Sequence, residues 1–219
     1  MRPLSLLETR VLGVLIEKAH TVPDSYPLSI NSLTLGCNQK TARDPVMATG
    51  EGDVQAGVDA LKLLSLVFEA SGSRVTRYEH NLGRALSLPS QSVALLCSLM
   101  LRGPQTTSEL RANSERLHRF ADLSAVEGFL DELANRATDK GGPLTVKLPR
   151  AAGSREPRWA HLLCGEVDSS RIVPADDEDF VAASELSAMK ARLGRAETEL
   201  EALRELVERL YRELDLPRG

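Results

Sequence analysis

The chain has 219 residues and a formal net charge of −4 at neutral pH, with 42% hydrophobic but only 4% aromatic residues. Its longest apolar run, from Val93 to Leu101, is too short to span a bilayer, and the N-terminus lacks the basic-then-apolar order of a signal peptide. The three cysteines form no C-x-x-C pair, so we expect reduced thiols and a cytoplasmic protein.

Charge is spread unevenly along the chain. Residues 1–165 hold 19 basic and 17 acidic side chains, whereas residues 166–219 hold 8 and 14. A polyanionic partner would therefore meet a nearly neutral body with local basic spots and an acidic tail. This balance gives only weak support to nucleic-acid binding, and it predicts strong salt sensitivity if such binding occurs.

The first 80 residues predict three helices followed by a β-hairpin. Ser5 and Glu8 have the spacing of a capping box, and apolar residues recur behind them at helical intervals. A second helix is expected after Ser29, and a third is expected over about residues 53–64. Two strands follow, the second of them over 75–80, and they pair around a Gly-Ser turn.

The next 80 residues predict the same order again. Apolar residues at helical spacing begin at Val93, and capping boxes at Thr106 and Ser124 are expected to open two further helices. Strands over 144–148 and 157–163 then complete the second hairpin.

One nine-residue pattern occurs in both hairpins. It reads G-S-R-x-x-R-aromatic-x-H, at residues 72–80 and again, 81 residues later, at 153–161. We expect the aromatic residue of each copy to cover the core and the histidine to end its strand in a hydrogen bond. Stacking of the aromatic ring on a base is the alternative.

Three helices followed by a hairpin form the winged-helix arrangement. The sequence therefore predicts a mainly α protein with small β-hairpins (α+β), built from two tandem winged-helix domains over 1–85 and 86–166. An acidic linker over 167–183 is expected to lead into a coiled-coil helix over 184–216.

The expected C-terminal helix carries apolar residues that alternate by three and four over four heptads. A parallel homodimer through this seam is the leading interpretation, and a helix folded onto its own domain or another assembly are the alternatives. The candidate dimerisation residues are Leu186, Met189, Leu193, Leu200, Leu203, Val207, Leu210 and Leu214.

Several stretches resemble the YceH family of uncharacterised bacterial proteins. The longest is C-N-Q-K-T-x-R-x-P-V-M, from Cys37 to Met47, and shorter ones lie at 26–31, 101–106 and 161–167. The resemblance covers about residues 4–168 and implies two winged-helix domains in tandem. It implies no activity, so function must be argued from the residues.

The basic residues lie mainly in the wings and loops, whereas the third helices carry mainly acids. This distribution favours the wings and loops as the DNA-contacting parts. We expect these residues to contact phosphates, or a wing arginine to enter the minor groove. The alternatives are a solvated surface and, for the loop over 38–47, a purely structural role. The candidate nucleic-acid-binding residues are Arg74, Arg77, Lys147, Arg150, Arg155, Arg158, Lys40, Arg43, Arg111 and Arg116.

No motif of a catalytic or metal site is present: the sequence lacks a glycine-rich phosphate loop, G-x-S-x-G and H-E-x-x-H. We therefore expect no enzyme, no catalytic residue, no metal and no cofactor, and we interpret Cys37 as a buried, inert thiol. The leading hypothesis is a dimeric DNA-binding regulator. Its rival is a protein-interaction adaptor, which would show an apolar patch on its third helices.

Overall fold

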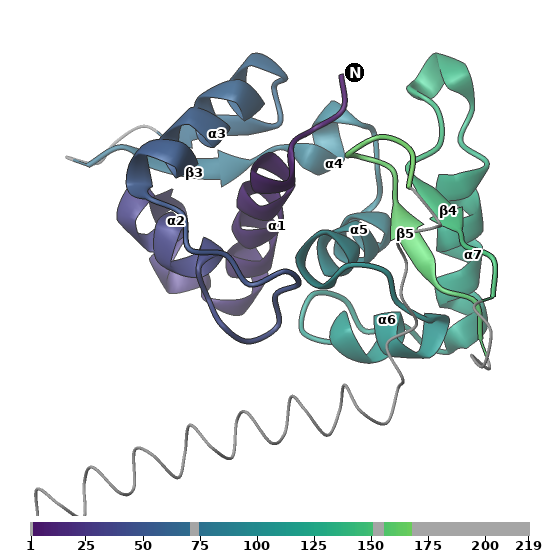
Figure 1. Cartoon of the computed structure of the whole chain (residues 1–219). Coiled ribbons are helices and arrows are strands. Elements are labelled where there is room, and N and C mark those ends of the chain that lie inside the picture. The colour runs from purple at the N-terminus through teal and green to yellow at the C-terminus, as the bar shows by residue number, and fades with distance from the viewer. Residues whose placement is uncertain (1, 71–74, 151–155, 168–219) are drawn as a thin grey trace, which may run out of the picture. The chain divides into compact units, whose positions relative to one another are not determined.

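The structure, a computed structural model, describes residues 2–70, 75–150 and 156–167 (Figure 1). Two candidate wing arginines, Arg74 and Arg155, lie outside these residues. The predicted linker beyond residue 167 and the whole predicted coiled-coil helix, with every residue of its apolar seam, lie outside them as well. These assignments stay predictions.

The first helix begins where the sequence predicts. α1 spans Leu6–Thr21, and the Ser5 hydroxyl accepts a hydrogen bond from the backbone N–H of Glu8 at 3.1 Å. A carboxylate oxygen of Glu8 in turn accepts a hydrogen bond from the Ser5 N–H at 2.7 Å. These two bonds satisfy donors that the start of a helix otherwise leaves unpaired.

The first half continues with two more helices and a small sheet. In chain order these are a 3-10 turn (Pro23–Ser25), β1 (Leu28–Ser29), α2 (Ile30–Cys37), α3 (Glu51–Leu63), β2 (Val67–Ala70) and β3 (Arg77–His80). The strands form an antiparallel sheet in the order β1-β3-β2. α3 begins two residues earlier than predicted because the Asp53 carboxylate accepts a hydrogen bond from the Gly50 N–H at 3.3 Å, which makes Gly50 the N-cap.

The second half has the same order of elements. After the short helix α4 (Leu82–Ala85), which follows β3, it consists of α5 (Ser90–Arg102), α6 (Thr107–Asn113), α7 (Leu123–Ala134), a 3-10 turn (Thr138–Lys140), β4 (Thr145–Lys147) and β5 (Trp159–His161). Gln105 pairs with Trp159 on β5 as Leu28 pairs with Tyr78 on β3, so the strand pairing repeats too. The described chain is therefore a mixed α+β protein with small antiparallel sheets.

The helix starts of the second half were predicted with mixed success. Thr106 caps α6 as expected, since its hydroxyl accepts a hydrogen bond from the Glu109 N–H at 3.2 Å. The prediction that Ser124 caps α7 is wrong. Asp122 takes that role, because its carboxylate accepts a hydrogen bond from the Ala125 N–H at 2.8 Å. Aspartate and serine are about equally good N-caps, and a carboxylate also interacts favourably with the helix dipole.

The two halves meet where α1 packs against α5. The Cys97 thiol on α5 donates a hydrogen bond to the carbonyl of Gly13 on α1 at 3.3 Å. A Cβ atom at Gly13 would lie 2.9 Å from Cδ2 of Leu101, so any larger residue would force the Leu101 side chain to shift. The main cluster of buried side chains contains residues of both halves, and a smaller cluster around Trp159 belongs to the second half. The two stretches with this order of elements thus share a core, and the predicted division at residue 85 stays a prediction.

Candidate nucleic-acid interface

The second arginine of the duplicated pattern has the same backbone partner in both halves. Arg77 donates a hydrogen bond from Nη1 to the carbonyl of Pro27 at 2.8 Å, and Arg158 donates one from Nη1 to the carbonyl of Pro104 at 3.0 Å. Each of these prolines lies two residues before the N-cap of the second helix of its half. Each arginine therefore ties a hairpin strand to the segment that leads into that helix.

Arg158 has a further partner within the protein. Its guanidinium forms an ion pair with Glu109 at 3.1 Å, and both side chains are partly exposed. These bonds within the protein count against the predicted phosphate contacts of the hairpin arginines, because each such contact would require the bonds to break. Arg77 and Arg158 are therefore not part of the proposed interface.

The aromatic residues of the pattern are buried, which confirms that they cover the core. Tyr78 is 4% exposed and Trp159 is 1% exposed. The Tyr78 hydroxyl donates a hydrogen bond to the side-chain oxygen of Gln55 at 3.1 Å. Such burial leaves no ring face open to a nucleic-acid base.

The histidines of the pattern lie at the ends of β3 and β5, as expected, but their environment differs from the prediction. Nδ1 of His80 and Nδ1 of His161 are buried and have no hydrogen-bond partner among the described residues. Burial lowers the pKa of both rings to about 4, and the charge of His20 contributes at His80. Both rings are therefore neutral at physiological pH.

The loop over 38–50 holds Arg43 inside the protein. The Arg43 side chain is 0% exposed, and its Nη2 lies 2.6 Å from a carboxylate oxygen of Glu17 on α1. Burial raises the pKa of Glu17, but the hydrogen bond and charge of Arg43 outweigh it, so the pKa lies below its usual value. The guanidinium also donates to the carbonyls of Gly36 and Ala42. This geometry argues against a phosphate contact by Arg43.

A second buried arginine, not singled out from the sequence, holds the same loop. Arg10 on α1 donates hydrogen bonds to the carbonyl of Cys37 at 3.1 Å and to that of Pro45 at 2.7 Å. Charged residues at positions 10 and 17 stand on the otherwise apolar face of α1, and this break in the pattern is the signal that could have revealed the network. Cys37 is buried as expected, and burial raises the pKa of its thiol to about 12.

Five of the candidate contacts are exposed. They are Lys40, Arg111, Arg116, Lys147 and Arg150. Lys147 on β4 lies opposite Trp159, with its ammonium 5.3 Å from the ring centroid. At the matching position of the first half, opposite Tyr78, stands Glu69, which forms an ion pair with Lys62 of α3. The base of the hairpin is thus acidic in the first half and basic in the second.

The third helices turn their acids to the solvent. Glu51, Asp53 and Asp59 on α3 are exposed, and so are their counterparts on α7 at positions 127, 131 and 132. Either helix would bring carboxylates towards phosphates if it entered a major groove. The end of α3 also exposes Leu63, at 89%.

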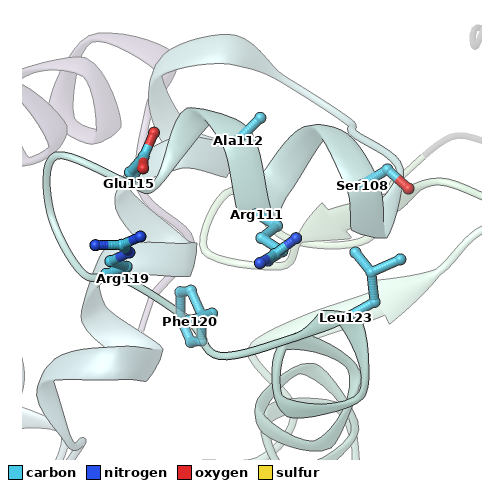
Figure 2. A pocket seen from close by; sticks show the side chains of 7 residues that line it. All are labelled: Ser108, Arg111, Ala112, Glu115, Arg119, Phe120 and Leu123. Atoms are coloured by element: carbon cyan, nitrogen blue, oxygen red, sulfur yellow. The ribbon is translucent and has the colours of Figure 1, made fainter.

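A pocket of about 330 Å³ lies between α6 and the segment that leads into α7 (Figure 2). Its lining residues are Ser108, Arg111, Ala112, Glu115, Arg119, Phe120 and Leu123. Arg111 donates a hydrogen bond from Nη2 to the carbonyl of Ala121 at 3.1 Å, which spans the loop. Two of the exposed cations of the second half thus line a concave surface.

Other kinds of site find little support in the described part of the chain. Residues 2–70, 75–150 and 156–167 contain no group of three His, Cys, Asp or Glu side chains placed to hold a metal ion. No helix among these residues combines the length and the hydropathy that a bilayer crossing requires.

These features define a small α+β protein with a repeated order of elements and six exposed Lys and Arg side chains among the described residues of its second half. A family model described as "Protein of unknown function, DUF480" matches residues 4–154. A UPF0502 protein of Burkholderia ambifaria is 57% identical over 219 residues, covering 99% of this chain and 91% of the relative. A UPF0502 protein of Methylibium petroleiphilum is 62% identical over 202 residues, covering 91% of this chain and 85% of the relative.

The chain therefore belongs to the DUF480/UPF0502 family. The expectation of an uncharacterised bacterial family is confirmed at this level.

Proposed function

We propose that this protein is a DNA-binding regulator built from two tandem winged helices. The YceH resemblance implies the winged helices but no activity. The repeated order of three helices and a hairpin supports the fold, since that order is the winged-helix arrangement. The proposed contacts to phosphate come from the second half, and they involve the hairpin and the α6 region more than the third helices.

The distribution of exposed cations carries the proposal. Among the described residues nine Lys and Arg side chains are exposed, and six of them belong to the second half: Arg111, Arg116, Arg119, Lys140, Lys147 and Arg150. Electrostatic contact with phosphates supplies most of the non-specific affinity of DNA-binding proteins. The second half therefore offers more cations for phosphate contacts than the first, and its exposed acids on α7 restrict these contacts to the hairpin and the α6 region.

The hairpin of the second half is the best-supported contact. Lys147 and Arg150 are exposed on and just after β4. Lys147 rests on Trp159, which is part of the core, so its ammonium is held in place. The acidic face of α7 favours an orientation in which the hairpin meets the backbone and α7 stays outside the groove.

Salt titration of DNA binding tests the proposal. Fluorescence anisotropy with a labelled genomic duplex would be measured across a range of salt concentrations for the full chain and for the double variant Lys147→Ala with Arg150→Ala. Two lost phosphate contacts should make the log–log slope shallower by roughly 1.8, at about 0.9 per contact. Arg84→Ala is the matched control, because Arg84 is an exposed arginine of the first half. Equal slopes for the double variant and the native chain would refute the proposed contacts.

One observation favours a protein-interaction adaptor as the second candidate. Leu63 on α3 is 89% exposed, and the exposed residues of the same helix include three acids. A partner with apolar and basic side chains would complement such a surface. Crosslinking of a tagged chain in cells, with Leu63→Glu as the variant, separates the candidates. An adaptor would lose a defined protein partner, whereas a DNA binder would keep its salt slope.

We also propose homodimerisation through the predicted C-terminal helix. Light scattering of the full chain and of a chain ending at residue 183 would show twice the protomer mass only for the full chain. A truncated protein with unchanged stoichiometry would exclude this helix as the dimer contact.

A further inference from the structure

The pocket beside α6 combines an apolar floor with two cationic side chains. Phe120 is buried and belongs to the hydrophobic cluster of the second half, so its ring closes the bottom of the pocket. It is held edge-on by His118, with ring centroids 4.7 Å apart, and by Phe129, at 6.0 Å. These two ring contacts restrict the Phe120 side chain without a ligand.

The charges of the pocket are not neutralised by one another. Three charged residues line it, Arg111, Glu115 and Arg119, which leaves a net charge of +1. No ion pair within 4.0 Å joins Glu115 to either arginine in the described part of the chain, and of these three side chains only that of Arg111 forms a hydrogen bond there. In the view of Figure 2 the Arg111 guanidinium lies between Phe120 and Leu123, above the apolar floor.

Arginine lining a concave apolar surface suits a particular ligand chemistry. The planar guanidinium donates two parallel hydrogen bonds to a carboxylate, while Phe120, Ala112 and Leu123 offer apolar contact. A volume of about 330 Å³ lies at the lower end of the range for small-molecule pockets, about 300–1,000 Å³. The ligand that fits is compact, with one acidic group and one apolar group.

We propose that the pocket formed by α6 and the segment 119–123 binds a small organic carboxylate with a compact apolar body. Arg111 and Arg119 bind the carboxylate, and the apolar body rests on Phe120 beside Leu123. The ligand bridges the second and third helices of the second half. Arg111 and Arg119 are also among the exposed cations assigned to the DNA contact, but binding of a free small molecule is tested without DNA and fails or succeeds separately.

Titration with defined probes tests the proposal on the full chain. Phenylacetate is the probe, and phenylacetamide, which has the same shape but no charge, is its control. Binding is followed by calorimetry and by the amide NMR signals of residues 108–123. We expect phenylacetate to give saturable shifts in these signals and phenylacetamide to bind at least about tenfold more weakly, since a hydrogen bond to a charged group is lost.

Three variants locate the site. Arg111→Ala and Arg119→Ala should each weaken phenylacetate binding by about tenfold. Ala112→Trp, a change at an exposed position of α6, should fill the pocket and abolish binding while keeping both arginines. Arg116→Ala is the matched control, because Arg116 is exposed in the same segment but does not line the pocket. It should leave the affinity unchanged.

Each outcome decides the proposal. Loss of phenylacetate binding in the pocket variants, with retention in Arg116→Ala and a folded far-UV circular dichroism spectrum for all four, supports it. No saturable shift in residues 108–123, equal binding of phenylacetamide, or full binding by Ala112→Trp overturns it.

Discussion

The connectors between the second and third helices differ in the two halves: one has a buried arginine, and the other has exposed arginines. In the first half the loop over 38–50 is held from inside by Arg10 and by the buried pair of Arg43 and Glu17. In the second half the corresponding segment exposes Arg116 and Arg119, and Arg119 lines a pocket. By contrast, the bond from the hairpin arginine to a proline carbonyl is the same in both. Duplication has kept the contacts that set the fold, while the connectors have diverged.

The largest expected effect comes from breaking the buried pair of the first half. Glu17→Ala leaves the Arg43 guanidinium buried without its carboxylate, and it should lower the free energy of unfolding by about 3 kcal/mol. Urea denaturation measures the loss. Glu115→Ala in the second half removes an exposed acid and should stay within about 0.5 kcal/mol of the native chain. Similar losses for the two variants would contradict the contrast between the connectors.

The duplicated histidines predict a pH dependence that both halves share. Their pKa is about 4 in the folded protein and about 6.5 when unfolded, so the unfolded chain binds more protons between these values. Stability is therefore complete above about pH 6.5 and falls as the pH drops towards 4, by on the order of 3 kcal/mol for each ring at most.

Urea denaturation at about pH 7 and about pH 5 tests whether the free energy of unfolding is lower at the lower pH. Carboxylates stay ionised over most of that range, so they contribute little to the difference. His80→Phe and His161→Phe should each remove part of the pH dependence, and the double variant should remove most of it. A pH dependence that persists in the double variant would assign it to other groups.

Substitution of the hairpin arginines should cause the next largest loss of stability. Arg77→Ala and Arg158→Ala each remove a charged hydrogen bond to a proline carbonyl and should cost about 2 kcal/mol. Arg158→Ala should cost up to about 1 kcal/mol more, since its ion pair with Glu109 is also lost. Chemical denaturation beside Arg84→Ala, an exposed control, measures both. A neutral result for either arginine would show that its proline bond does not stabilise that half.

The smallest effect is expected at the base of the second hairpin. Lys147→Ala removes a cation–π contact with Trp159 and should lower stability by about 0.5 kcal/mol. The matching residue of the first half, Glu69, forms an exposed ion pair with Lys62, so Glu69→Ala should cost a similarly small amount. A loss above about 2 kcal/mol at either position would mean that the hairpin base supports the core.

Short-range signals in the sequence correctly predicted where several helices begin. The capping boxes at Ser5 and Thr106 act within three residues, so the pattern alone locates the starts of α1 and α6. The start of α7 was missed because Asp122 and Ser124 compete as caps two residues apart, and local preference does not decide between them.

Long-range pairing accounts for what the sequence did not reveal about the site. Arg43 finds its carboxylate 26 residues away on α1, and Arg158 finds Glu109 at a separation of 49. No local pattern distinguishes such arginines from the exposed Arg111 and Arg150. The pocket was missed for a related reason, because its floor, Phe120, comes from a segment without helical or strand periodicity.

The glycine contact between α1 and α5 has a consequence for dissection of the molecule. The carbonyl of Gly13 on α1 accepts a hydrogen bond from Cys97, and Leu101 packs against the same glycine. A fragment holding only the second half would present the apolar flank of α5, including Leu96 and Met100, directly to water. Heat or denaturant should therefore melt both copies in one cooperative step, and each fragment made alone should aggregate.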